Sequence, residues 1–318
     1  MTAVDPTERR PDRSRPHAKH DGVGVADAAQ GGRAGSGGGS PSTATFGGEK
    51  GGRWPGRRRW ARWPGVVAGT SARRTVAEPG ELAVELGFYV IVTVMVSGLW
   101  RAAAASNGGS VAGYSGVALT WYIAASEATT IAVNFRMIEH IGRDIATGSI
   151  AAELLRPVSV LGVRLANELG KTMTRLACCI VVGLVMASAI GGAPPRPAAL
   201  ALALPSLVLA VACNLAAQHA VAASAFWLRD ATAAWFLYWK LVFVLGGMLI
   251  PLEAMPNWLE SVAHVLPFQA MAYAPARLAS GHVEPWLLVH QVFWLVVLAT
   301  AARAAFTAGE RRLQVVGG

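Results

Sequence analysis

The chain has 318 residues, of which 53% are hydrophobic and 15% charged, and its formal net charge is +9. Soluble domains carry about 25% charged residues, so this composition is typical of a membrane protein or of a chain with strongly clustered apolar residues. No long apolar run precedes Leu82, and such runs dominate after it. Half of the 28 lysines and arginines lie before residue 76 and most others flank apolar segments, which argues against a nucleic-acid partner.

Residues 1–75 are rich in Gly, Pro, Ser, Arg and Asp. Such a segment cannot bury enough apolar area to offset its ordering entropy, so we expect a disordered basic tail. Its stretch RWPGRRRWARWPG favours either contact with anionic lipid headgroups or a solvated tail without a partner. Residues 66–80 are a weak candidate for a helix at the membrane interface. Residues 76–318 are expected to form one membrane domain.

Six apolar segments follow the tail, and each is close to the roughly 20 residues that a helix needs to cross about 30 Å of hydrocarbon. Backbone polar groups inside a bilayer have to be satisfied within the segment, so helices are required. We therefore predict an all-α integral membrane protein with six transmembrane helices. The segments are residues 82–100, 117–135, 172–190, 200–227, 235–251 and 286–306.

The charges in the connecting loops predict the orientation of these helices. One side holds the basic tail and the arginines that follow the second, fourth and sixth segments, whereas the other side holds only Arg101, Arg196 and Arg277. Cytoplasmic loops carry an excess of Lys and Arg. We therefore expect a multi-pass protein of the plasma membrane with both termini in the cytoplasm.

The loop between the second and third segments reads RMIEHIGRDIATGSIAAELLRPVSVLGVRLANELGK. Ile138, Ile141 and Ile145 have the spacing of one helical face, and polar side chains occupy the opposite side. Gly148 is expected to end this helix. Pro157 cannot continue a helix without losing a hydrogen bond. The loop is therefore predicted to hold an amphipathic helix, a break, a second short helix and a proline turn.

The tripeptide Gly170-Lys171-Thr172 matches the end of a phosphate-binding P-loop. A P-loop needs a glycine five positions earlier, after a strand, but this chain has Leu165 there in helical surroundings. We therefore expect no ATP binding in this chain, no catalytic residue and no cofactor. Its three cysteines lie in apolar runs without metal-ligand spacing, so no metal site is expected either.

Four stretches resemble the membrane subunits of ABC (ATP-binding-cassette) exporters of the type-2 permease class. They are GYSGVALTWYIAASE, GRDIATGSIAAELLRPVS, PNWLESVAHVLPFQAMAYAPARLASG and RRLQVVGG, in the order found in that family. The most specific piece is D-I-x-x-G-x-[IL]-x-x-x-L-L-x-P-[VI], which runs from Asp144 to Val158. The resemblance covers residues 88–318 and implies a transport subunit that forms the translocation pathway and performs no chemistry itself.

The resemblance also implies partners and a cargo. A separate ATPase subunit would bind ATP and Mg, and a second permease copy, identical or related, would complete the pathway in membrane lipid. Short re-entrant helices are implied between the fifth and sixth segments. The cargo would be a hydrophobic drug or natural product, a lipid or a glycan.

The loop between the second and third segments is the implied docking site for the ATPase subunit, although an amphipathic helix lying on lipid explains the same pattern. Ile141, Ile145, Leu154 and Leu155 would be its apolar contacts, and charged side chains its rim. The implied coupling residues are Glu139, Ile141, Arg143, Asp144, Ile145, Gly148, Glu153, Leu154, Leu155, Arg156 and Pro157.

Polar residues inside the apolar segments form a second group of candidates, because such groups usually face the bundle interior or a wet cavity. Thr120, Glu127 and Asn134 repeat every seven residues on one helical face, and Asn214 and Gln218 lie one turn apart. An alternative role for Asn and Gln is to bridge helices within the chain. The candidate pathway residues are Glu127, Asn134, Asn214 and Gln218.

Other charged groups near the segment ends are expected to be solvated. Lys171 and Arg175 are placed on the headgroup side, Glu85 in water, and Lys240 is expected either to line a cavity or to snorkel to the cytoplasmic interface. An alternative function is a membrane-embedded lipid-modifying enzyme. Glu127 and His219 are its only mid-membrane candidates for chemistry, and neither has a partner at motif spacing.

Overall fold

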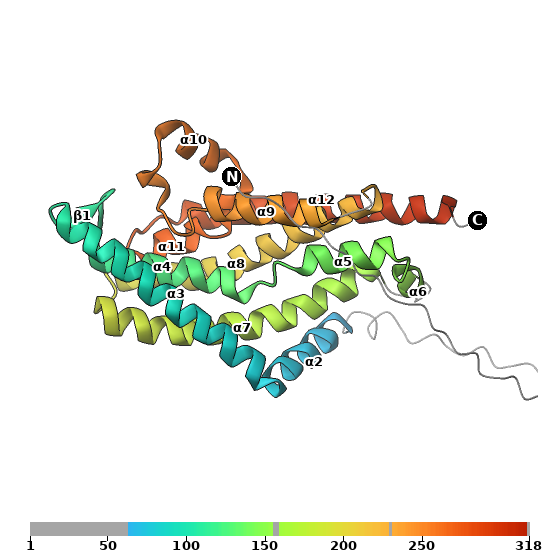
Figure 1. Cartoon of the computed structure of the whole chain (residues 1–318), viewed down its shortest axis with the longest axis horizontal. Helices are drawn as coiled ribbons and strands as arrows, with labels where there is room; N and C mark the ends of the chain where they lie inside the picture. The colour runs from blue at the N-terminus through green and yellow to red at the C-terminus, as the bar shows by residue number, and fades with distance from the viewer. Residues whose placement is uncertain (1–62, 155–158, 229–230, 317–318) are drawn as a thin grey trace, which may run out of the picture. The chain divides into compact units, whose positions relative to one another are not determined.

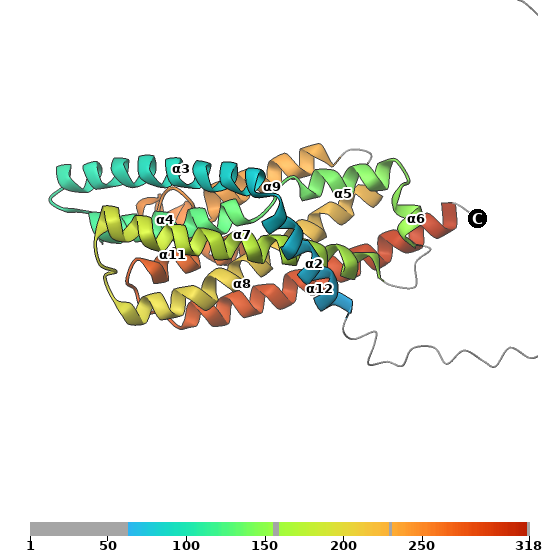
Figure 2. The same ribbon diagram turned by 90° about the horizontal axis from the view of Figure 1, so that it is seen from below.

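The computed structural model describes residues 63–154, 159–228 and 231–316, all of which belong to one compact unit. Most of these residues are helical, and the long helices run alongside one another in two perpendicular views (Figure 1; Figure 2). The long helices are α3 (Pro79–Ser106), α4 (Gly116–Ala132), α7 (Val160–Gly191), α8 (Pro197–Ala222), α9 (Thr232–Leu245) and α12 (Trp286–Val316).

Each of the six predicted apolar segments overlaps one of these helices, and α3, α7 and α12 extend beyond the predicted bounds. Among the described residues, four helices are long and apolar enough to cross a membrane: α3, α7, α8 with its 3-10 extension η1 (Ala223–Phe226), and α12. The other two are shorter, with 17 residues in α4 and 14 in α9. A helical membrane protein is therefore confirmed with four clear spans, while six crossings require α4 and α9 to cross as well.

Helix α4 lies at the centre of the bundle and packs on α3, α7 and α11. Ser115 caps its start by accepting a hydrogen bond from the backbone N–H of Ala118 at 3.2 Å. Leu119, Tyr122 and Ile123 have no exposed area at all. Neighbouring helices therefore cover most of α4, and lipid covers little of it.

The fifth predicted segment, residues 235–251, extends beyond the end of its helix. Helix α9 stops at Leu245, and the chain turns at Gly247, whose φ of +65° favours glycine. The hydroxyl of Tyr122 on α4 donates a hydrogen bond to the carbonyl of Gly247 at 2.5 Å, which fixes the turn against the central helix.

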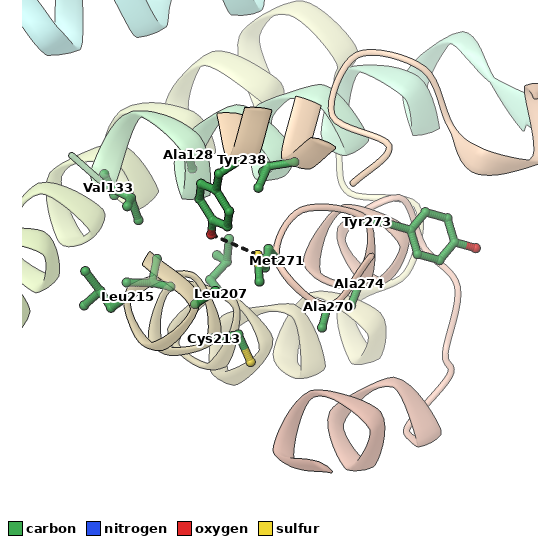
Figure 3. Packing of buried hydrophobic residues seen from close by; sticks show 14 of the residues in the cluster. Ala128, Val133, Leu207, Cys213, Leu215, Tyr238, Ala270, Met271, Tyr273 and Ala274 are labelled. Atoms are coloured by element: carbon green, nitrogen blue, oxygen red, sulfur yellow. Dashed lines mark hydrogen bonds between the residues drawn. The ribbon is translucent and has the colours of Figure 1, made fainter. Parts of the chain in front are cut away.

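Four short elements connect α9 to α12, in agreement with the short helices implied there. They are η2 (Leu252–Ala254), α10 (Asn257–Val265), η3 (Pro267–Ala270) and α11 (Tyr273–Ala279). Helix α11 is buried against α4 and α8. Figure 3 shows Met271, just before α11, in the core beside Tyr238 of α9 and Leu207 of α8.

Two expectations about the architecture need correction. Helix α2 (Trp63–Ala77) occupies residues that were expected to be a disordered tail. It packs along α7, where a Cβ atom at Gly170 would collide with the carbonyl of Ala68, so contact with α7 orders a segment of weak helical pattern. The protein is also not purely helical, because β1 (Ser110–Val111) and β2 (Tyr114–Ser115) form a small antiparallel ribbon between α3 and α4.

Candidate functional site

Helix α5 (Met137–Ala146) is the amphipathic helix predicted after the second segment, and α6 (Ile150–Leu154) is the short helix that follows it. The apolar face of α5 packs on α8, η1 and α9. Ile138, Ile141 and Ile145 are only 0%, 2% and 7% exposed. Gly142 permits the closest approach, since a Cβ atom there would collide with the Cβ atom of Ala231.

This packing corrects both interpretations of the apolar face. Ile141 and Ile145 are not available as contacts for a partner protein, and the face does not lie on lipid, because helices of the same chain cover it. The amphipathic pattern predicts that these isoleucines are covered. It does not tell whether a partner protein, lipid or another part of the chain covers them. The surface of α5 that a partner can reach is its polar face.

The polar face of α5 carries two ion pairs centred on Glu139. Arg143 Nη2 lies 2.8 Å from Glu139 Oε1, and Arg136 Nε lies 3.3 Å from Glu139 Oε2. Both arginines are largely exposed, and so is His140. Exposed pairs of this kind contribute little to stability, so these side chains are free to exchange partners.

Arg164 of α7 joins the two short helices. Its Nη2 lies 2.8 Å from Asp144 Oδ2 and 3.0 Å from Glu153 Oε1, and its Nε donates to Glu153 Oε2 at 3.0 Å. The planar guanidinium suits such a two-pronged contact. Asp144 and Glu153, expected at the rim of a docking surface, therefore hold α5 and α6 onto α7. Arg164 is a residue that the sequence pattern alone did not single out.

The turn between α5 and α6 contains Gly148, which follows the end of α5 as predicted. Its φ of +75° lies in the left-handed region that glycine adopts at helix ends. Ser149 donates a hydrogen bond from its hydroxyl to the carbonyl of Asp144 at 3.1 Å. The remaining predicted coupling positions, the side chain of Leu154 and residues Leu155, Arg156 and Pro157, lie outside the described residues.

A cavity of about 450 Å³ lies between α5, α6, α7 and α2. A second cavity of about 250 Å³ shares Asn134, Asn167 and Lys171 with it. Asn134 had been grouped with Glu127 as a pathway residue, but α4 ends at Ala132 before reaching it. The structure therefore places Asn134 beside the docking loop rather than on the buried face of α4.

Charged side chains near the start of α7, which were expected to be solvated or to face the headgroups, form ion pairs instead. Arg175 lies 2.8 Å from Glu81 and 2.9 Å from Glu85, so it faces α3 and not the lipid headgroups. Lys171 lies 3.0 Å from Glu168 within a continuous helix. The tripeptide that resembles a P-loop is thus part of α7, where the backbone cannot wrap around a phosphate.

Glu127 is buried on α4 at 2% exposure, and its Oε1 has no hydrogen-bond partner among the described residues. Neither of the two cavities beside the loop is lined by it. Three residues before Glu127, the carbonyl of Ala124 accepts a hydrogen bond from the Tyr89 hydroxyl of α3 at 2.8 Å. Its unpaired carboxylate oxygen keeps Glu127 as a candidate pathway residue.

Asn214 bridges α8 to α9, and Gln218 hydrogen-bonds Asn214 within α8. Gln218 Nε2 donates to Asn214 Oδ1 at 2.9 Å, and Tyr238 of α9 donates to the same oxygen at 2.9 Å. This arrangement favours the structural alternative, in which amides join spans within one chain. The neighbouring His219 is fully buried and donates from Nδ1 to the carbonyl of Leu215 at 2.8 Å.

Lys240 is exposed on α9, and its ammonium group lies 4.3 Å from the ring centroid of Trp239 and 5.3 Å from that of Phe236. A lysine stem along apolar surface with its charge beside aromatic rings favours snorkelling over a place inside a cavity.

The comparison with protein families decides the class. Residues 89–317 match the family model of the ABC-2 family transporter proteins. The chain belongs to the ABC-2 transporter family. No curated protein matches the sequence at a significant level. Membership confirms the resemblance and identifies a multi-pass membrane permease of the ABC exporter type, which is a transport subunit.

The family match begins inside α3, so α2 precedes the part of the ABC-2 permease that the family defines. The loop that holds α5 and α6 lies within the match, and so do Arg164 and both of its carboxylate partners. The clamp formed by Arg164 is therefore part of the region that the family model covers, whereas α2 lies outside it.

The opposite end of the permease holds a second cluster centred on an arginine. Arg277 of α11 lies 2.8 Å from Glu253 and 3.1 Å from Glu284, and it donates to the hydroxyl of Tyr114 at 2.5 Å. Tyr114 and Tyr273 both donate to Glu253, at 3.0 and 2.6 Å. The cluster ties the β ribbon, the segment after α9 and α11 together.

Burial and, next, the carboxylate of Glu253 raise the pKa of the Tyr114 hydroxyl above its usual range. The phenol therefore stays protonated and serves as a hydrogen-bond donor. Burial, followed by the charge of Arg277, lowers the pKa of His282, whose ring lies 5.1 Å from that of Tyr114. The sequence marked Arg277 only as a loop charge, because its partners lie far away along the chain.

Proposed function

We propose that this ABC-2 permease is the membrane subunit of an ATP-driven exporter, and that a separate ATPase subunit binds ATP and Mg and docks on the loop formed by α5 and α6. The family match supports the transport role. The observation that carries the docking is the clamp of Arg164, which holds α5 and α6 as one unit on α7. A loop fixed to a membrane span can pass a partner's movement to that span.

The proposed docking surface is the polar face of α5 together with the turn that follows it. Arg136, His140 and Arg143 are exposed there, and Gly148 and Ser149 are exposed in the turn. A basic surface selects an acidic groove on the partner and speeds their encounter. The apolar face of α5 meanwhile contributes rigidity, because it is packed inside the permease.

The proposed topology has six crossings, both termini in the cytoplasm and the docking loop on the same side. Half of all basic residues precede residue 76, which supports a cytoplasmic N-terminus in the plasma membrane. Helix α4 crosses at the centre of the bundle, and α9 crosses with the help of the segment up to the turn at Gly247.

The permease is proposed to act as a pair with a second, identical or related copy, so that cargo passes between the two. Helix α3 presents an exposed apolar stripe, including Val84, Phe88 and Met95, that suits either a second copy or lipid. A hydrophobic drug or natural product, a lipid or a glycan is the proposed cargo. Glu127→Gln tests the pathway role of Glu127, since transport should change while assembly stays intact.

The deciding experiment is purification of the tagged full chain from native membranes in a mild detergent. We expect an ATPase subunit that carries a GxxxxGK[ST] motif to co-purify. The pair of substitutions Arg136→Glu and Arg143→Glu should release this subunit. The matched control is Arg311→Glu, an exposed arginine at the end of α12. A permease that always purifies without such a subunit would overturn the proposal.

A further inference from the structure

A groove of about 510 Å³ lies on the side of the permease away from α5, between α2, α7, α8 and α12. Its floor is formed by α7 and α8, and α2 packs along α7 at one edge (Figure 2). Neither the docking loop nor the candidate pathway residues take part in it. The lining residues are Trp63, Pro64, Gly65, Ala68, Gly162, Leu165, Ala166, Leu169, Ala212, Leu215, Ala216, Leu295, Ala299 and Ala302.

The lining contains no charged side chain, and most of it is glycine, alanine or leucine. Gly162 is required for this shape, because a Cβ atom there would lie 3.1 Å from the ring of Trp63 and 2.5 Å from the hydroxyl oxygen of Ser159. The small residues on α7, α8 and α12 leave room for the groove, and the indole of Trp63 closes one of its edges. The groove is therefore suited to a flexible apolar chain and not to a polar solute.

Three of the four clear membrane spans, α7, α8 and α12, contribute to the groove. Its lining on α7 lies in the first ten residues of that helix, next to the docking loop. On the proposed orientation this level is the cytoplasmic half of the membrane. The groove extends from the apolar parts of α8 and α12 to the start of α7, where hydrocarbon meets the lipid headgroups, so lipid chains are the apolar molecules present at the highest concentration.

A cationic group stands at the cytoplasmic end of the groove. Ala299 and Arg303 of α12 are four residues apart, so they lie on the same helical face, with Arg303 one turn nearer the C-terminus. Arg303 is exposed, and among the described residues no carboxylate pairs with it. It lines a shallow hollow together with Arg311. A guanidinium in this position matches the phosphate of a lipid headgroup.

We propose that this groove binds one acyl chain of an anionic phospholipid from the surrounding membrane, with the lipid phosphate held by Arg303. The bound lipid fills the space between α2 and the three spans. It thereby fastens α2 to the bundle at the level of the docking loop. The assignment to the cytoplasmic leaflet rests on the proposed orientation, whereas the binding itself does not depend on any ATPase subunit.

The test uses the full chain in detergent, supplemented with phosphatidylglycerol or phosphatidylcholine, and counts retained lipids by native mass spectrometry. Ala299→Trp places a large side chain in the groove at an exposed position, so it should not disturb the core. Its matched control is Ala301→Trp, which is exposed on the same helix but does not line the groove. We expect Ala299→Trp to retain one phosphatidylglycerol molecule fewer per chain than both the wild type and Ala301→Trp.

The headgroup contact is tested separately with Arg303→Gln. This variant should still retain one lipid, but its preference for phosphatidylglycerol over phosphatidylcholine should fall by at least threefold. Equal lipid counts in Ala299→Trp and Ala301→Trp would overturn the proposal. A wild type that retains no lipid would do the same, since the groove would then be covered by another part of the chain or by a second copy. Neither outcome bears on whether an ATPase subunit co-purifies.

Discussion

Two arginines, one at each end of the permease, organise very different surroundings. Arg164 holds the docking loop through Asp144 and Glu153, whose side chains are 41% and 38% exposed. Arg277 holds the opposite end through Glu253 and Glu284, which are 23% and 27% exposed, and through the hydroxyl of Tyr114. The α5 and α10 regions lie at opposite ends of the helices in Figure 1. The same residue type thus makes a solvent-accessible clamp at one end and a shielded network at the other.

This difference in exposure matters because solvent determines how much an ion pair contributes to stability. An exposed pair exchanges its partners for water at little cost. A shielded pair is expensive to break, since the remaining charge has lost both water and partner. We infer that the end around Arg277 is a fixed part of the permease and that the loop held by Arg164 is the part that moves. Substitutions at the two ends should therefore have effects of different size and kind.

The largest effect is expected from Arg277→Met, which keeps the apolar stem and removes the charge. Glu253 would remain in a shielded site without its counter-charge, at a cost of about 3 kcal/mol in the free energy of unfolding. The measurement is thermal unfolding of the purified permease in detergent. Arg196→Met is the matched control, because Arg196 is an exposed arginine in the loop before α8. Equal melting temperatures for the two variants would show that the network is not structural.

The second prediction concerns Tyr273→Phe, which removes one hydroxyl donor from Glu253. Hydrogen bonds to charged groups contribute about 2 kcal/mol, so the permease should be less stable by that amount. The loss should shrink when Arg277→Met is already present, because residues of one network do not act independently. A double-mutant cycle measured by thermal unfolding checks this. Strict additivity would contradict the shared network.

The third prediction moves to the docking loop and concerns its backbone. Gly148 has a φ of +75° with nothing near its Cβ position, so Gly148→Ala adds strain without a clash. The left-handed conformation should cost about 1.5 kcal/mol. Gly69→Ala is the control, because Gly69 lies within α2 in equally open space and alanine favours a helix there. The two alanines should shift the melting temperature in opposite directions.

Much of this architecture could be predicted from periodicity and apolar length. Each long helix overlaps a predicted apolar segment, although α7 begins well before its segment, and α5 ends just before Gly148 as its sequence indicates. These features depend on neighbouring residues, whose spacing is visible in the sequence. The amphipathic face of α5 was also visible, although its burial against Ala231 and the rest of the chain was not.

The rest depends on contacts between distant residues. Arg164 meets Glu153 eleven positions earlier, and Arg277 meets Tyr114 163 positions earlier, and neither pairing has a local signal. Helix α2 overlaps residues 66–80, which gave only a weak helical signal, because its order comes from packing on α7. Asn214 shows the reverse case, since a polar residue in a span is equally compatible with a pathway and with the bridge to Tyr238 of α9 found here.

A small effect on stability, and the largest effect on transport, is expected from Arg164→Gln. Its carboxylate partners are solvent-accessible, so the free energy of unfolding should fall by only about 1 kcal/mol. The ATPase subunit should still co-purify, because the exposed face of α5 is unchanged. The coupling between ATP hydrolysis and transport should be lost, since α5 and α6 are no longer fastened to α7.

Arg143→Gln separates this role from that of an ordinary surface charge. Arg143 pairs with Glu139 on the outer face of α5, and among the described residues it makes no ion pair with α7. Its loss should change stability by less than about 0.5 kcal/mol and weaken docking rather than coupling. Measuring ATPase activity and subunit co-purification on both variants distinguishes the two roles. The opposite result would be a loss of the partner subunit in Arg164→Gln and a loss of coupling alone in Arg143→Gln. It would show that Arg164 serves docking and Arg143 serves coupling, which reverses the roles proposed here.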